Sequence, residues 1–178
     1  MIRDLPHATI RRVRPGDLVA VLAAARCWWD RPEAVPPLPR LLFEHFSTNA
    51  FVAEVEGELV GFVLGFVSQT YPGEAHVQAV AVRPDQRRAE LGRALYERFF
   101  GAACDQYCSV VCAGVPADDE AALAFHRALG FSVEAPEVEP AAPSAARNDG
   151  PAERPLTRLT RAVECGPAGY GVGRLLAG

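Results

Sequence analysis

One stretch decides the fold: residues 80–95 read Val-Ala-Val-Arg-Pro-Asp-Gln-Arg-Arg-Ala-Glu-Leu-Gly-Arg-Ala-Leu. An apolar run ends at Val82, and Pro84 stops a strand ladder because proline has no N–H to donate. A helix is predicted to open near Leu91, with Gly92 in its first turn. The sequence therefore predicts a strand, a basic turn and a helix start. The free N–H groups and positive dipole end of such a start favour a phosphate or pyrophosphate.

Outward from this stretch, alternating and helical patterns predict the other elements. Strands are expected at 8–14, 51–55, 59–68, 75–82, 107–114, 131–134 and 154–163, and helices at 17–29, 39–46, 91–103 and 118–129. Asp17 is the expected N-cap of the first helix, and Gly130 the residue that ends the last one. The run 59–67 is apolar on both faces, as in a strand covered on both sides. The pattern predicts an α/β (α+β) fold, a mixed sheet with helices on both faces.

Length and composition restrict the class of protein. The chain has 178 residues, enough for one domain, predicted at 1–165 with a flexible loop at 136–153 and a glycine-rich tail at 166–178. Its net charge is −4, so no basic field predicts a nucleic-acid partner. No stretch reaches the roughly 20 apolar residues of a membrane span. We therefore expect neither a nucleic-acid nor a membrane partner.

The five cysteines predict free thiols. The N-terminus has no secretory signal, so we expect a reducing cytoplasm, in which thiols stay unpaired. Cys108 and Cys112 fall in the predicted strand 107–114, where a free cysteine behaves as a small hydrophobe. Neither a close cysteine pair nor a matching histidine pair is present, so no metal site is predicted.

Two segments resemble the GNAT superfamily of N-acetyltransferases. Residues 82–92 are similar to the acyl-CoA pattern of that family, Arg or Gln, two residues, Gly, one residue, Gly or Ala. Residues 119–131 resemble its Asn-x-x-Ala-x-x-Phe-Tyr-x-x-Leu-Gly-Phe helix. The resemblance covers about Thr9 to Phe131 and implies a mostly antiparallel central sheet flanked by helices.

The resemblance also implies a cofactor site, with acetyl-CoA as co-substrate. Backbone groups of Val80, Ala81 and Val82 would pair with the pantetheine arm like an added strand. The amides of Arg88, Ala89, Glu90, Leu91, Gly92 and Arg93 would hold the pyrophosphate, with Arg87 beside them. The acyl group would lie where the strands that end near Val82 and Gly114 splay apart.

Three residues depart from the family pattern. Glu90 replaces a glycine, and a carboxylate about 4 Å from a phosphate would cost up to about 4 kcal/mol at an effective dielectric near 20. Glu90 either caps the helix start and competes with the cofactor or swings outward at little cost. Asp119 replaces asparagine and adds negative charge near the cofactor. His126 replaces tyrosine; it either protonates the leaving sulfur or is a packing histidine.

The general base and the acceptor site are predicted from strand alternation. Glu74, His76 and Gln78 share one face of a regular strand, and a carboxylate there, Glu74, could accept the amine proton. Solvent-facing polarity explains the same residues without catalysis. The acceptor would meet aromatic and acidic side chains of the first helices and their loop, unless these simply pack on the sheet: Trp28, Trp29, Glu33, Phe43, Glu44 and Phe46.

The predicted function is transfer of an acetyl group from acetyl-CoA to a primary amine, by direct attack in a ternary complex. The acceptor is a small molecule or an amino group on a larger one, and a homodimer is compatible with the sequence. The alternative is a degenerate domain that binds CoA weakly or not at all and serves in regulation or interaction. Glu90 and Asp119 favour that alternative.

Overall fold

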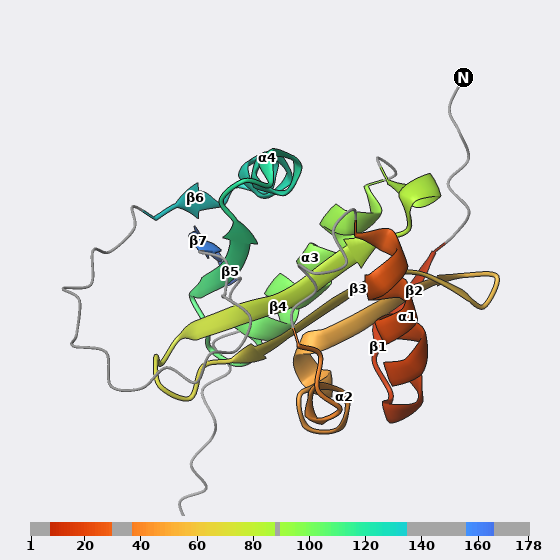
Figure 1. Cartoon of the computed structure of the whole chain (residues 1–178). Helices are drawn as coiled ribbons and strands as arrows, with labels where there is room; N and C mark the ends of the chain where they lie inside the picture. Colours follow the sequence, from red (N-terminus) through yellow and green to blue (C-terminus); the bar gives the residue numbers. More distant parts are fainter. Residues whose placement is uncertain (1–7, 30–36, 88–89, 135–155, 166–178) are drawn as a thin grey trace, which may run out of the picture.

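The fold is one seven-stranded sheet in the order β1-β2-β3-β4-β5-β7-β6 (Figure 1). The computed structural model describes residues 8–29, 37–87, 90–134 and 156–165. The strands are β1 (Thr9–Arg12), β2 (Ala50–Val55), β3 (Glu58–Val67), β4 (Glu74–Val82), β5 (Val110–Pro116), β6 (Ser132–Val133) and β7 (Leu156–Ala162). The helices are α1 (Leu18–Trp28), α2 (Leu41–His45), α3 (Leu91–Cys104) and α4 (Glu120–Ala128), with 3-10 turns η1 (Pro15–Asp17), η3 (Ser47–Asn49) and η4 (Pro84–Gln86).

Strand pairing confirms the predicted mixed, mostly antiparallel sheet. Of the strand pairs within the described residues, only β4 and β5 run parallel, from Glu74 opposite Val110 to Val77 opposite Ala113. All other neighbouring pairs are antiparallel. The parallel pair needs a crossover, which α3 supplies between the two strands.

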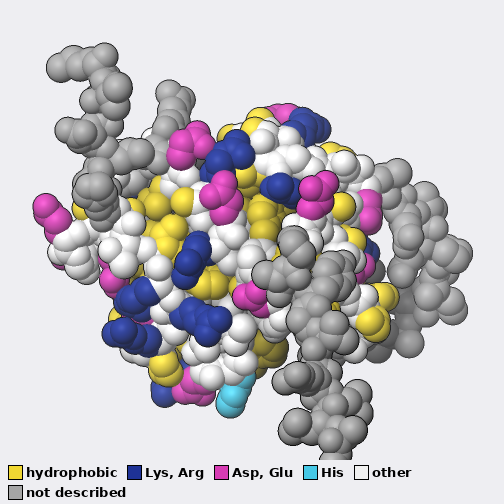
Figure 2. All heavy atoms as spheres, turned by 180° about the vertical axis from the view of Figure 1, so that it is seen from behind, with side chains coloured by type: hydrophobic (Ala, Val, Ile, Leu, Met, Phe, Trp, Pro, Cys, Tyr) yellow, Lys and Arg dark blue, Asp and Glu magenta, His cyan; other side chains and the backbone are white. Residues whose placement is uncertain are grey.

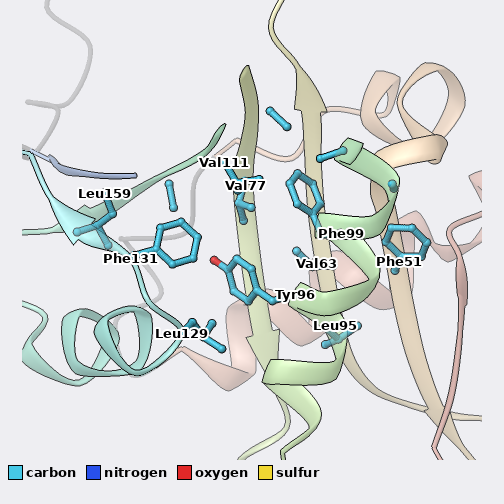
Figure 3. Packing of buried hydrophobic residues seen from close by; sticks show 14 of the residues in the cluster. Phe51, Val63, Val77, Leu95, Tyr96, Phe99, Val111, Leu129, Phe131 and Leu159 are labelled. Carbon is cyan, nitrogen blue, oxygen red and sulfur yellow. The ribbon is translucent and has the colours of Figure 1, made fainter. Parts of the chain in front are cut away.

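Helices cover both faces of the sheet, as the apolar run at 59–67 predicted. Residues of α1 and α2 pack with one set of strand side chains, which includes Val52, Phe62 and Leu64. Residues of α3 and α4 pack with the opposite set; Figure 3 shows Leu95, Tyr96 and Phe99 of α3 against this face. Strand alternation explains the division, because Phe62 and Val63 point to opposite sides.

Turn residues fix several element boundaries. Glu56 and Gly57 close the β2–β3 hairpin, both at positive φ, 52° and 82°. Gly130 ends α4 at φ 85°, as predicted. Asp17, however, makes no side-chain cap to α1. Its carboxylate accepts from the Arg14 backbone N–H and from the Arg11 guanidinium, because a 3-10 turn precedes α1 and takes its hydrogen bonds.

The cysteine prediction is wrong for two of the five residues. Cys104 at the end of α3 and Cys165 after β7 form a disulfide with their Cα atoms 5.4 Å apart. Cys27, Cys108 and Cys112 are free. Cys108 and Cys112 are buried as predicted, but β5 begins only at Val110, so Cys108 lies before the strand.

The surface carries both signs of charge. Figure 2, the view from behind, shows arginines, carboxylates and apolar side chains over the same face. Among the described residues, no helix is long and apolar enough to cross a membrane. Nor do three His, Cys, Asp or Glu side chains come together as metal ligands in the described ranges.

Candidate active site

The candidate site lies where β4 leaves β5. Pairing between these strands ends at Val77 and Ala113, while β4 continues to Val82 against β3. Arg83 N–H donates to the Val60 carbonyl at 2.9 Å. Because hydrogen bonding alternates along an antiparallel ladder, Ala81 bonds to Phe62, and Val80 and Val82 turn their backbone groups away from β3. The strand edge predicted to receive a cofactor is therefore open at Val80 and Val82. Ala81 was predicted to pair with the cofactor as well, but in this structure its backbone N–H and carbonyl groups face Phe62 of β3.

A bulge in β4 controls which side chains face the site. Leu64 pairs with Ala79 and Gly65 with Val77, so Gln78 is the extra residue. Gly65 is required here, because an added Cβ would lie 2.3 Å from the His76 carbonyl oxygen. Ala75 and Val77 pack toward α3, whereas Ala79 and Ala81 pack toward α1 and α2.

The bulge leaves the predicted polar residues on one side of the sheet. Glu74 and His76 alternate with the buried Ala75 and Val77, so they lie on the face that α1 and α2 cover. Gln78 reaches the Pro37 carbonyl near α2 at 3.5 Å. The prediction assumed a regular strand, whereas Gln78 is the bulge residue; the shared role of these three side chains stays a prediction.

Glu74 is already paired in this structure. Its two carboxylate oxygens accept from Arg158 Nη2 of β7 at 3.1 and 3.2 Å. Arg158 also lies 3.2 Å from the Glu134 carboxylate and 3.5 Å from the Cys112 sulfur. Sequence reasoning missed Arg158, because nothing in β7 indicates which strand it will lie beside.

His76 has a different environment. Its ring packs on Phe66 with centroids 5.4 Å apart. Burial lowers its pKa below the ordinary value, the positive charge of Arg158 lowers it further, and the Glu74 charge opposes both. Burial and the Arg158 charge thus favour the neutral imidazole of His76, the form that can accept a proton.

The turn before α3 keeps a backbone shape suited to glycine. Glu90 adopts φ 57°, in the left-handed region, just before α3 begins at Leu91. Its carboxylate makes no cap to the helix and accepts from Arg93 Nε at 2.8 Å. Of the two predicted orientations, the structure has the outward one. Arg88 and Ala89 lie outside the described residues.

Two residues of the family motifs have structural roles at α3 and α4. Gly92 allows α3 to approach α4, because a Cβ there would lie 2.9 Å from the Phe125 ring. Asp119 caps α4, since its Oδ1 accepts from the Ala122 N–H at 2.9 Å. The carboxylate of Asp119 thus satisfies a helix terminus.

His126 is a core residue in this structure, with 4% of its surface exposed. Nδ1 lies 2.8 Å from the Ala122 carbonyl, which can only accept, so Nδ1 carries the proton. Nε2 then accepts from the Tyr96 hydroxyl at 2.7 Å. Burial lowers the pKa of His126, against the raising effects of the Ala122 hydrogen bond and the Asp119 charge. This geometry favours the packing role and gives the acid role no support.

The end of α1 reaches the open edge of β4. Trp29 donates its indole N–H to the Val80 carbonyl at 3.2 Å. Arg87 donates from Nε to the Val82 carbonyl at 3.2 Å and from Nη2 to the Trp28 carbonyl. Of the residues predicted to line the acceptor site, Trp29 therefore contacts β4 directly. The other described ones pack in the core or lie on the surface of α2.

The packing residues fill the layer under α1 and α2. Trp28 stacks on Phe62 with centroids 6.3 Å apart, and Phe43 is 1% exposed in the core. Phe46 packs edge-on against Phe66. Glu44 pairs with Arg40 on the surface of α2. Glu33 lies outside the described residues.

Comparisons with known proteins agree with this geometry. The sequence pattern of the Acetyltransferase (GNAT) family matches residues 18–131, well over half of the chain. L-amino acid N-acyltransferase MnaT of Escherichia coli (strain K12) is 32% identical over 122 residues, which are 65% of this chain and 70% of that protein.

Solved structures show the same fold. Ard1 from Thermoplasma volcanium superposes with a TM-score of 0.69 at 23% identity, over 88% of this chain and 98% of that one. The acetyltransferase yncA from Salmonella typhimurium, solved with its cofactor acetyl-CoA, gives a TM-score of 0.62 at 21% identity, over 89% and 95%.

Proposed function

Because this chain belongs to the acetyltransferase (GNAT) family, we propose that it transfers an acetyl group from acetyl-CoA to a primary amine. One observation carries the proposal: the open edge of β4 at Val80 and Val82 leads directly into the turn before α3. A cofactor with amide groups in its arm and a pyrophosphate at one end fits this sequence of sites.

Val80 and Val82 would hold the pantetheine arm, and the amides of the 88–93 turn would hold the pyrophosphate. Arg87 supplies positive charge beside that turn, whereas Arg93 is paired with Glu90. Acetyl-CoA is the co-substrate and supplies a thioester. The outward orientation of Glu90 supports binding, since its carboxylate is paired with Arg93.

The reaction needs a base for the ammonium form of the acceptor. We assign this role to His76 in place of Glu74, because Arg158 pairs with the Glu74 carboxylate. His76 takes one proton, the neutral amine attacks the thioester carbon, a C–N bond forms and the C–S bond breaks. The second amine proton goes to the departing sulfur, and His76 returns its proton to solvent.

Binding is the first experiment. A ligand at 100 times its dissociation constant stabilises the folded state by about 2.7 kcal/mol, which a thermal-shift titration with acetyl-CoA detects. Glu90→Gly is the companion variant and should bind at least as tightly. Absence of a shift for both proteins at millimolar acetyl-CoA would support the degenerate domain instead.

Transfer is the second experiment. Mass spectrometry after incubation with acetyl-CoA and a panel of L-amino acids, diamines and peptides should show one class gaining an acetyl group. His76→Gln should lower kcat by about 10²-fold or more, whereas binding of acetyl-CoA should stay within twofold. Binding without transfer to any amine would contradict the enzymatic proposal.

The cytoplasmic setting expected from the sequence stays a prediction. The Cys104–Cys165 disulfide argues against it, since reducing compartments keep thiols free. Alkylation of intact cells followed by mass spectrometry of these two cysteines would decide their state. A homodimer also stays a prediction, tested by light scattering.

A further inference from the structure

The open edge of β4 is not free of partners in this structure. Its two outward-facing carbonyls accept from two side chains, Val80 from the Trp29 indole and Val82 from Arg87, both at 3.2 Å. Arg87 also bonds to the Trp28 carbonyl at the end of α1. These contacts link α1, β4 and the turn before α3.

These contacts form because the pairing of β4 with β5 ends at Val77. Among the described residues, β4 beyond Val77 has a partner strand on one side only, and the carbonyls on the other side need donors. Trp29, 51 residues before Val80, supplies a distant donor, and Arg87, five residues after Val82, supplies a local one. Arg87 is exposed, and Trp29 is half-buried and packs against the core cluster under α1 and α2, so both contacts lie outside the buried centre of the sheet.

We propose that Trp29 and Arg87 are placeholders, which occupy the carbonyls that the amide N–H groups of the pantetheine arm take when acyl-CoA binds. This inference rests on the proposed function. A carbonyl oxygen can accept two hydrogen bonds, but a strand-like partner would run along the same edge as these two side chains, so they must move aside before it can pair. The apparent affinity for CoA is then reduced by the fraction of molecules that hold the contact.

Loss of the Trp29 contact and loss of the Arg87 contact should have opposite effects on the free energy of CoA binding. Trp29 gives up a neutral hydrogen bond and gains none from the cofactor, so its contact opposes binding. Arg87 exchanges the Val82 and Trp28 carbonyls for the phosphates of the cofactor, where both partners are charged and the guanidinium can pair through two nitrogens at once. Loss of the Trp29 donor should therefore tighten CoA binding, whereas loss of Arg87 should weaken it.

Calorimetry with CoA on four proteins tests the proposal. Trp29→Phe keeps an aromatic ring but removes the donor, and CoA should bind about two- to tenfold tighter, as expected for one neutral hydrogen bond. Trp28→Phe is the matched control, since its ring stacks on Phe62 and leaves the Val80 contact in place. CoA affinity of that control should stay within twofold of the wild type. Arg87→Gln should bind CoA more weakly.

A second readout uses the wild-type chain alone. The chain has two tryptophans, so ¹⁵N spectra show two indole N–H signals, and Trp28→Phe assigns them. Saturating CoA should move the Trp29 signal more than the Trp28 signal. Equal or weaker CoA binding by Trp29→Phe, or an unmoved Trp29 indole in a CoA-saturated protein, would overturn the inference and leave the proposed function standing. Failure of the wild type to bind CoA would overturn both.

Discussion

Replacing Tyr96 with phenylalanine should destabilise the protein by about 2 kcal/mol. The Tyr96 hydroxyl is fully buried in α3 and donates to His126 Nε2 at 2.7 Å. Its removal leaves that nitrogen without a donor inside an aromatic cluster, where an unsatisfied polar atom costs about 1–3 kcal/mol. For a chain of this size, about 2 kcal/mol lowers Tm by about 4–8 °C.

A double-mutant cycle isolates the pair. His126→Phe leaves the Tyr96 hydroxyl unpaired and should cost a similar amount. The double variant removes both polar groups, so its destabilisation should be about 1–3 kcal/mol smaller than the sum of the single values. Tyr71→Phe is the matched control, because its side chain is 60% exposed and its loss should change stability by no more than about 0.5 kcal/mol.

Urea unfolding followed by circular dichroism measures the free energy of unfolding of the wild type, the three variants of the cycle and the Tyr71→Phe control. The reasoning fails if Tyr96→Phe costs less than about 0.5 kcal/mol, or if the two single changes add within about 0.5 kcal/mol. Either result would mean that the hydrogen bond between Tyr96 and His126 contributes little to stability in solution.

Three further predictions concern stability. Gly65→Ala should destabilise by about 3 kcal/mol because its Cβ meets the β4 backbone, whereas Gly101→Ala, with nothing within 4 Å, should stabilise the helix by about 0.5–1 kcal/mol; urea unfolding compares them. Cys104→Ser opens a disulfide that spans 61 residues and should lower the free energy of unfolding by about 4 kcal/mol, the same loss that dithiothreitol should cause in the wild type. Burial lowers the pKa of His126 in the fold, so below about pH 6.5 the unfolded chain binds a proton that the folded chain does not. Tm should therefore be highest above pH 6.5 and decline toward pH 5; His126→Phe should make this decline less steep, and the part that remains should include His76, whose pKa is also lowered by burial.

Local patterns in the sequence were enough for most elements. The order of strands and helices, the β2–β3 hairpin at Glu56 and Gly57, and the end of α4 at Gly130 follow from periodicity and turn residues. These features depend on neighbours within a few positions, so the sequence carries them directly. Errors are confined to boundaries, such as the later start of β5, and to the cap assigned to Asp17.

The candidate site likewise has features that follow from local sequence and features that depend on tertiary contacts. The sequence alone determined the motif that joins β4 to α3, because strand, turn and helix start are contiguous in residues 80–95. Only the tertiary structure decided that Arg158 pairs with Glu74, that His126 turns inward to Tyr96, and that Trp29 reaches Val80. Each of these contacts joins residues 30 or more positions apart. Side-chain hydrogen bonds of that kind depend on the register and packing of whole elements, which no local pattern specifies.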